Sequence, residues 1–88
     1  MAEKRILVVE DDPDGQEMVT TMLQHMNFAV DTADNGEQAS HIIFNSGIKY
    51  SAIIIDLALP GKDGWELLGE ILHDANTHSI PCIAVTAF

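Results

Sequence analysis

The 88-residue sequence is poor in cysteine and in positive charge. Its single cysteine, Cys82, excludes a disulfide within the chain. Only four Lys and Arg residues stand against fourteen Asp and Glu residues, which gives a formal net charge of −10. Nucleic acid and anionic lipid would repel such a surface, so we expect the chain to bind neither. The charge suits a cation or a basic patch on a protein partner, or it serves solubility alone.

Long apolar runs are also absent. No stretch approaches the length of a transmembrane helix, and Glu10-Asp11-Asp12 interrupts the first apolar run too early for a signal peptide. The sequence shows no repeat, low-complexity tract or internal linker. Apolar residues make up 47% of the chain, which is enough to build a core. We therefore expect one small domain of a cytoplasmic protein.

The most informative stretch is a run of apolar residues that ends in a carboxylate. Ala52 and three isoleucines are followed directly by Asp56. A run without polar alternation predicts a strand covered on both faces, as in a parallel sheet between helices. Asp56 would lie at the carboxyl end of this strand, where open α/β sheets bind ligands. The Pro and Gly residues in segment 57–64 predict a loop next. We expect Asp56 to be the chemical centre.

Strands and helices alternate along the rest of the chain. Apolar runs predict strands at 6–9 and 82–85, and the weaker alternation at 28–33 predicts a strand toward a sheet edge. Helical spacing predicts three helices, the first with Asp12 as its N-cap and Asn27 as its left-handed end. Their expected core faces are Met18, Met22, Leu23 and Met26; Ala39, Ile42 and Ile43; and Trp65, Leu68, Ile71 and Leu72.

The predicted βαβαβαβ order implies a parallel sheet with right-handed crossovers, so all strands end at one edge. The acidic residues Glu10, Asp11, Asp12 and Asp56 and the hydroxyl of Thr86 should therefore converge there. Carboxylates without a counter-charge repel one another, which favours a bound cation. Oxygen ligands without nearby His or Cys indicate Mg²⁺ rather than zinc. An Asp beside Mg²⁺ can attack phosphorus to form an aspartyl phosphate, and a hydroxyl can hydrogen-bond a phosphoryl oxygen.

Segments 6–13, 34–39, 54–64 and 80–87 together resemble, in order and spacing, the receiver domain of bacterial two-component response regulators. The resemblance implies a flavodoxin-like α/β fold of three layers with the strand order 2-1-3-4-5. It also implies a signalling domain that accepts a phosphoryl group from a sensor histidine kinase or phosphotransfer protein. Such a domain is not an enzyme beyond self-catalysed phosphoryl transfer and autodephosphorylation.

The resemblance also implies a role for each matching residue. Asp56 is the expected phosphoacceptor and a ligand of Mg²⁺. Asp11 would bind the metal directly, Glu10 through water, and Ala58 through its backbone carbonyl. Thr86 would hydrogen-bond the phosphoryl group and drive the switch. We expect Asp12, by contrast, to cap the first helix rather than to bind metal.

The sequence departs from the family pattern at two places. Leu59 stands where the family usually has Met, and the sequence given ends just after the predicted fourth strand. A complete receiver continues through a helix, a strand and a helix that hold its phosphate-pairing lysine and switch aromatic. Lys62 lies in the loop after Asp56 and does not replace that lysine. We therefore expect residues 1–88 to be a receiver domain that is incomplete at its C-terminus.

Truncation would leave the strand at 82–85 as an apolar edge and uncover one face of the sheet. Both features favour pairing with another chain, so we expect a homodimer or a higher oligomer. A second hypothesis follows, in which the chain is a non-phosphorylated receiver that acts as a dimerisation or docking module.

Two further site types fit the acidic segment less well. A haloacid-dehalogenase-like phosphatase needs its Asp-x-Asp motif directly after the first strand, and Asp12-Pro13-Asp14 lies two residues late. An EF-hand needs Glu at its twelfth position, where this chain has Thr21. We expect the four histidines to have surface or packing roles, Cys82 to be a buried apolar residue, and Trp65 to pack against the core.

Overall fold

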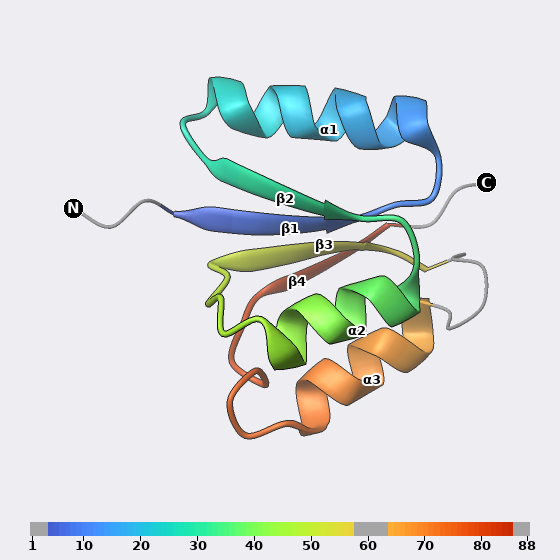
Figure 1. Ribbon diagram of the computed structural model, residues 1–88, viewed down its shortest axis with the longest axis vertical. Helices are drawn as coiled ribbons and strands as arrows, with labels where there is room; N and C mark the ends of the chain where they lie inside the picture. Colours follow the sequence, from blue (N-terminus) through green and yellow to red (C-terminus); the bar gives the residue numbers. More distant parts are fainter. Residues whose placement is uncertain (1–3, 58–63, 86–88) are drawn as a thin grey trace.

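The computed structural model describes residues 4–57 and 64–85. These residues form four strands and three helices in strict alternation, which confirms the predicted order (Figure 1). The elements are β1 (Arg5–Val9), α1 (Pro13–His25), β2 (Ala29–Ala33), α2 (Gly36–Asn45), β3 (Ala52–Asp56), α3 (Gly64–His73) and β4 (Cys82–Val85). Four positions that the sequence singled out lie outside the described residues, namely Ala58, Leu59, Lys62 and Thr86.

All four strands are parallel and follow the order β2-β1-β3-β4. Helix α1 covers one face of this sheet, and α2 and α3 lie side by side on the other (Figure 1). The three-layer α/β arrangement predicted from sequence is therefore confirmed. β2 lies at a sheet edge, as its weaker pattern indicated. Because β1 and β3 are central neighbours, the residues that follow them meet at one end of the sheet.

The core lies mainly between the sheet and the α2–α3 layer. Leu7 and Val9 of β1 and Ile53 and Ile55 of β3 point to that layer, and all four are buried. Ile6 and Val8, which alternate with them, are buried as well. Burial of both faces explains why β1 reads as an unbroken apolar run, and Ile54 on the second face of β3 is partly buried. Each fully buried aliphatic side chain contributes about 1.5–3 kcal/mol to folding.

The predicted core face of α1 is wrong at its three methionines. Met18, Met22 and Met26 are about 60% exposed, and α1 has no fully buried residue. Among the described residues, α1 contacts mainly β1 and β2, and Leu23 is the one member of the predicted face that is half-buried. The periodicity located a helix correctly, but a single supporting layer buries only a narrow stripe of it.

The observed buried face of α3 is also shifted around the helix from the predicted one. Trp65 and Leu72 are exposed, so the expected packing of Trp65 against the core is also wrong. Leu67 and Ile71 are fully buried, and Leu68 packs partly against the core. Trp65 and Leu72 thus lie beside the buried stripe rather than on it.

The helix ends follow the sequence closely, with one exception. Asn27 has a φ of 69°, as expected for the residue that ends the turn after α1. Asn35 caps α2 by accepting a hydrogen bond from the Gln38 backbone N–H over 2.7 Å. Asp12 occupies the N-cap position of α1, but its side chain makes no capping hydrogen bond. The expected capping role of that side chain is therefore not found.

A polar cluster ties the edge strand β2 to the centre of the sheet. Asp31 of β2 accepts a 2.8 Å hydrogen bond from the Arg5 guanidinium and another from the hydroxyl of Tyr50. Tyr50 is buried, and burial together with the Asp31 carboxylate raises the pKa of its phenol. The cluster therefore joins β1, β2 and Tyr50, which precedes β3, away from the end of the sheet that carries the three carboxylates.

β4 forms the second sheet edge and pairs with β3 on one side. Ile83 and Val85 are 54% and 46% exposed, and Cys82 is only partly buried rather than fully buried as expected. Within the ranges 4–57 and 64–85, no helix is long and apolar enough to span a bilayer.

Candidate metal centre at the strand ends

Three carboxylates meet where the two central strands end. Glu10 and Asp11 follow β1, and Asp56 is the last residue of β3. One carboxylate oxygen from each side chain lies within 4.8 Å of the other two. The parallel pairing of β1 with β3 brings these distant positions together. The convergence of Glu10, Asp11 and Asp56 predicted from sequence is therefore confirmed.

The three side chains differ in their exposure. Asp56 is buried, with 8% of its surface exposed, whereas Glu10 is partly buried and Asp11 is exposed. Partial burial raises the pKa of Glu10, and the negative charge of Asp56 raises it further. The backbone N–H of Asp12 opposes this rise by donating to Glu10 Oε1 over 3.0 Å. The net effect is a pKa of Glu10 above its ordinary value, so the fold disfavours a charge on this carboxyl.

These residues fit a Mg²⁺ ion better than a softer metal. Carboxylate oxygens are hard ligands, and the cluster contains neither His nor Cys. Mg²⁺ binds through one or two carboxylates and keeps several waters. The exposed Asp11 leaves one side of the cluster open to water, while Asp56 is anchored in the sheet. The donor set and its exposure therefore match the predicted metal.

Helix α3 begins directly against the end of β3. A Cβ atom added to Gly64 would overlap the main chain of Asp56 and Leu57. Only glycine permits this close approach, so Gly64 fixes the start of α3 beside the candidate centre. The sequence predicted a loop that includes Gly64, but it did not indicate that Gly64 lies against the main chain of Asp56.

Sequence reasoning also missed Gln16, which lies in the first turn of α1. Its side-chain amide nitrogen donates a 3.0 Å hydrogen bond to the backbone carbonyl of Glu10. A polar residue near a helix start is common, so no pattern in the sequence distinguished it. Only the fold shows that Gln16 reaches the acidic turn.

The other candidate residues do not join the cluster. His25, His41, His73 and His78 are exposed, as the expected surface role requires. Partial burial raises the pKa of the Cys82 thiol, which disfavours the reactive thiolate and agrees with a packing role.

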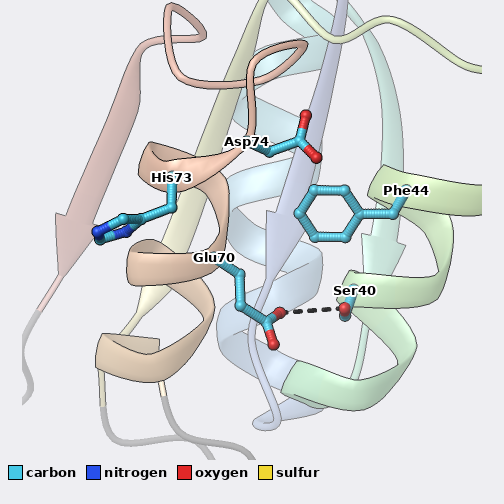
Figure 2. Close-up of a pocket in the computed structure, with 5 residues that line it drawn as sticks. All are labelled: Ser40, Phe44, Glu70, His73 and Asp74. Carbon is cyan, nitrogen blue, oxygen red and sulfur yellow. Dashed lines mark hydrogen bonds between the residues drawn. The ribbon is translucent and has the colours of Figure 1, made fainter.

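A separate groove lies between α2 and α3, away from the strand ends (Figure 2). Its volume is about 360 Å³. The Ser40 hydroxyl donates to Glu70 Oε1 over 3.1 Å at one end, and the Phe44 ring lies beside Asp74 at the other (Figure 2). The ring of His73 points away from it. None of the groove residues belongs to the carboxylate cluster.

We predict that Glu10→Gln stabilises the metal-free protein above about pH 4.5. The folded pKa of Glu10 lies above its ordinary value of 4.5, so the fold disfavours the ionised form. The wild type should lose unfolding free energy as pH rises from there through the folded pKa, and the variant should not. Urea unfolding from about pH 3.5 to pH 7 without divalent ions measures this difference. Glu17→Gln, at an exposed site on α1, is the control, and a pH-independent gain in Glu10→Gln would contradict the account.

Comparison with known proteins identifies the family. A family model described as the response regulator receiver domain matches residues 6–88. The chain is 35% identical over 83 residues to the transcriptional regulatory protein CusR of Escherichia coli K12, covering 94% of this chain and 35% of CusR. It is 33% identical over 88 residues to an uncharacterised 14.6 kDa protein of Leptolyngbya boryana, covering all of this chain and 66% of that protein. The chain thus spans only part of each relative.

Solved structures agree with this assignment. Response regulator TrrA of Thermotoga maritima, in complex with Mg²⁺ and BeF, matches with a TM-score of 0.86 and 40% identity over 97% of this chain and 70% of TrrA. The phosphorylated cyanobacterial phytochrome response regulator RcpA matches with a TM-score of 0.89 and 28% identity over 99% of this chain and 67% of RcpA. These matches confirm the flavodoxin-like fold. The chain belongs to the receiver domain family of two-component response regulators.

Proposed function

We propose that Asp56 accepts a phosphoryl group from a sensor histidine kinase or phosphotransfer protein, with Mg²⁺ bound at the strand ends. The convergence of Glu10, Asp11 and Asp56 carries this proposal, because it joins a buried nucleophile to the ligands of a hard cation. The match to TrrA, solved with Mg²⁺ and BeF, supports the same metal and a phosphoryl-like group at this kind of site.

The metal, when bound, would neutralise charge on the carboxylates and on the incoming phosphoryl oxygens. Asp11 and Asp56 would hold it directly, Glu10 through water, and Ala58 through its carbonyl. These assignments follow the family resemblance together with the positions of the three carboxylates. The residues would thus supply a preorganised site, which is the main requirement for phosphoryl transfer.

Asp56 would act as the nucleophile. One of its carboxylate oxygens bonds to phosphorus while the phosphorus–nitrogen bond of the donor phosphohistidine breaks, and the imidazole leaves with the electron pair. The position of Asp56 at the end of the central strand β3 restricts its motion, so the attacking oxygen needs little reorganisation. The hydroxyl of Thr86 would then donate a hydrogen bond to a phosphoryl oxygen, and this contact would drive the switch.

This role is that of a phosphoacceptor rather than of an enzyme that turns over a substrate. We place it in the cytoplasm, where its kinase partner would present the phosphoryl group. The net charge of −10 supports protein partners over nucleic acid or a membrane surface.

We expect incubation with acetyl phosphate and Mg²⁺ to add one phosphoryl group to the wild type and none to Asp56→Asn. Intact-mass measurement detects the adduct, and omission of Mg²⁺ should abolish it. Asp74→Asn, which removes a carboxylate far from the strand ends, is the matched control and should be phosphorylated normally. Absence of an adduct on a wild type that circular dichroism shows to be folded would contradict the proposal.

The alternative of a non-phosphorylated dimerisation or docking module rests on a different observation. β4 is an edge strand whose Ile83 and Val85 are about half exposed, and Met18, Met22 and Met26 are exposed on α1. An apolar edge strand is a template for pairing with another chain. A homodimer through this edge or the adjoining sheet face is compatible with phosphorylation as well.

We predict a dimer or higher oligomer by light scattering at micromolar concentration. Ile83→Lys should shift the protein toward monomer, because a charge on an edge strand opposes pairing. Thr32→Lys places the same charge at an exposed position on the opposite edge strand, β2, and should leave the oligomer intact. A monomeric wild type, or equal effects of the two variants, would rule out assembly through β4.

A further inference from the structure

We propose that Gln16 is a positioning residue that fixes the main chain of the acidic turn Glu10–Asp12. Through this turn it would hold the carboxylates of Glu10 and Asp11 in place for the divalent cation. The link to the cation rests on the proposed function, whereas the effect on the turn does not. Gln16 belongs to α1 and has no part in the ligand set described above.

The side-chain amide of Gln16 is surrounded by oxygen acceptors. Its Nε2 atom lies 3.0 Å from the carbonyl oxygen of Glu10, 3.0 Å from Oδ1 of Asp34 and 3.4 Å from the carbonyl oxygen of Ala33. The two amide hydrogens are thus shared among three acceptors. A flipped amide would place Oε1 against these oxygens, so the surroundings determine which atom is nitrogen. The Gln16 side chain is therefore held in one orientation.

The hydrogen bond to the Glu10 carbonyl constrains the next residue. Because the peptide group is planar, fixing the carbonyl of Glu10 also fixes the N–H and the Cα of Asp11. Glu10 is held from its other side by its own N–H, which donates to the Ala33 carbonyl over 3.0 Å. Gln16 thus completes a clamp on the residue that joins the rigid strand β1 to the exposed Asp11.

The acceptor Asp34 is itself fixed by the start of α2. Its backbone N–H donates to Oε1 of Gln38, and the backbone N–H of Gln38 donates to Oδ1 of Asn35. A carboxylate acceptor strengthens the hydrogen bond from the Gln16 amide. Gln16, on α1, therefore connects the acidic turn after β1 to the turn between β2 and α2.

Such support matters because Mg²⁺ demands near-octahedral geometry with short metal–oxygen distances. Residues that orient metal ligands typically change metal affinity by about 10–100-fold when they are replaced. We expect loss of the Gln16 amide to weaken Mg²⁺ binding about tenfold, the lower end of that range. Met has a similar length and helix propensity but no donor, so Gln16→Met removes the hydrogen bonds and keeps the side-chain length and the helix.

The experiment compares wild type, Gln16→Met and Gln24→Met by NMR on the 88-residue chain. Gln24 is an exposed residue of the same helix, so its replacement is a matched control. Backbone order at Asp11 is measured without metal, and Mg²⁺ affinity is measured by titration with MgCl₂. In Gln16→Met, the order parameter of Asp11 should fall from about 0.85 toward 0.6, and Mg²⁺ binding should weaken about tenfold. Gln24→Met should match the wild type in both.

An unchanged Asp11 order parameter in folded Gln16→Met, or an equal effect of Gln24→Met, would overturn the proposal. If Gln16→Met does not fold, the wild type alone tests the proposal. A freely rotating Gln16 side-chain amide would contradict the clamp. A rigid amide whose hydrogens exchange slowly with solvent would support it. A wild type that does not bind Mg²⁺ would instead contradict the proposed function. The metal-free order of Asp11 would still decide whether Gln16 positions the turn.

Discussion

Electrostatic repulsion among three carboxylates is the constraint on which the rest of this structure depends. Parallel strands must end at the same edge, and the two central ones deliver Glu10, Asp11 and Asp56 to one place. Partial burial raises the pKa of Glu10, and the neighbouring negative charge of Asp56 raises it further. A bound cation would relieve this repulsion, and we propose a divalent one because it fits these hard oxygen ligands.

The scaffold holds these charges in place from several directions. β1 is buried on both faces and β3 on the face toward α2 and α3, so neither strand can shift without losing core contacts. Gly64 lets α3 begin against the main chain at Asp56, and Gln16 ties the Glu10 carbonyl to the β2–α2 turn. Away from the carboxylate cluster, Asp31 accepts hydrogen bonds from Arg5 and Tyr50 and so holds β2 against the rest of the sheet.

The sequence was sufficient where one local signal determined the outcome. The apolar runs of β1 and β3 predicted buried strands, and right-handed crossovers then placed Asp11 beside Asp56. Prediction from the sequence failed where the burial of a side chain depended on which element covers it. Met18 and Trp65 have helical spacing suited to a core, yet they are exposed because periodicity gives a helix but not the width of its buried stripe. The role of Gln16 depends on the start of α1 meeting two separate turns in space, which no local pattern encodes.

Site-resolved broadening of NMR signals by Mn²⁺ is the most direct test of the central claim that the strand ends form one cation site. The account predicts that substoichiometric Mn²⁺ broadens the amides of Glu10, Asp11, Asp56 and Leu57, and that excess Mg²⁺ restores them. The amide signals of Arg5 and Tyr50, at the other end of the strands, should stay sharp. Broadening that is spread over the acidic surface, or centred on Glu70 and Asp74 in the α2–α3 groove, would contradict it.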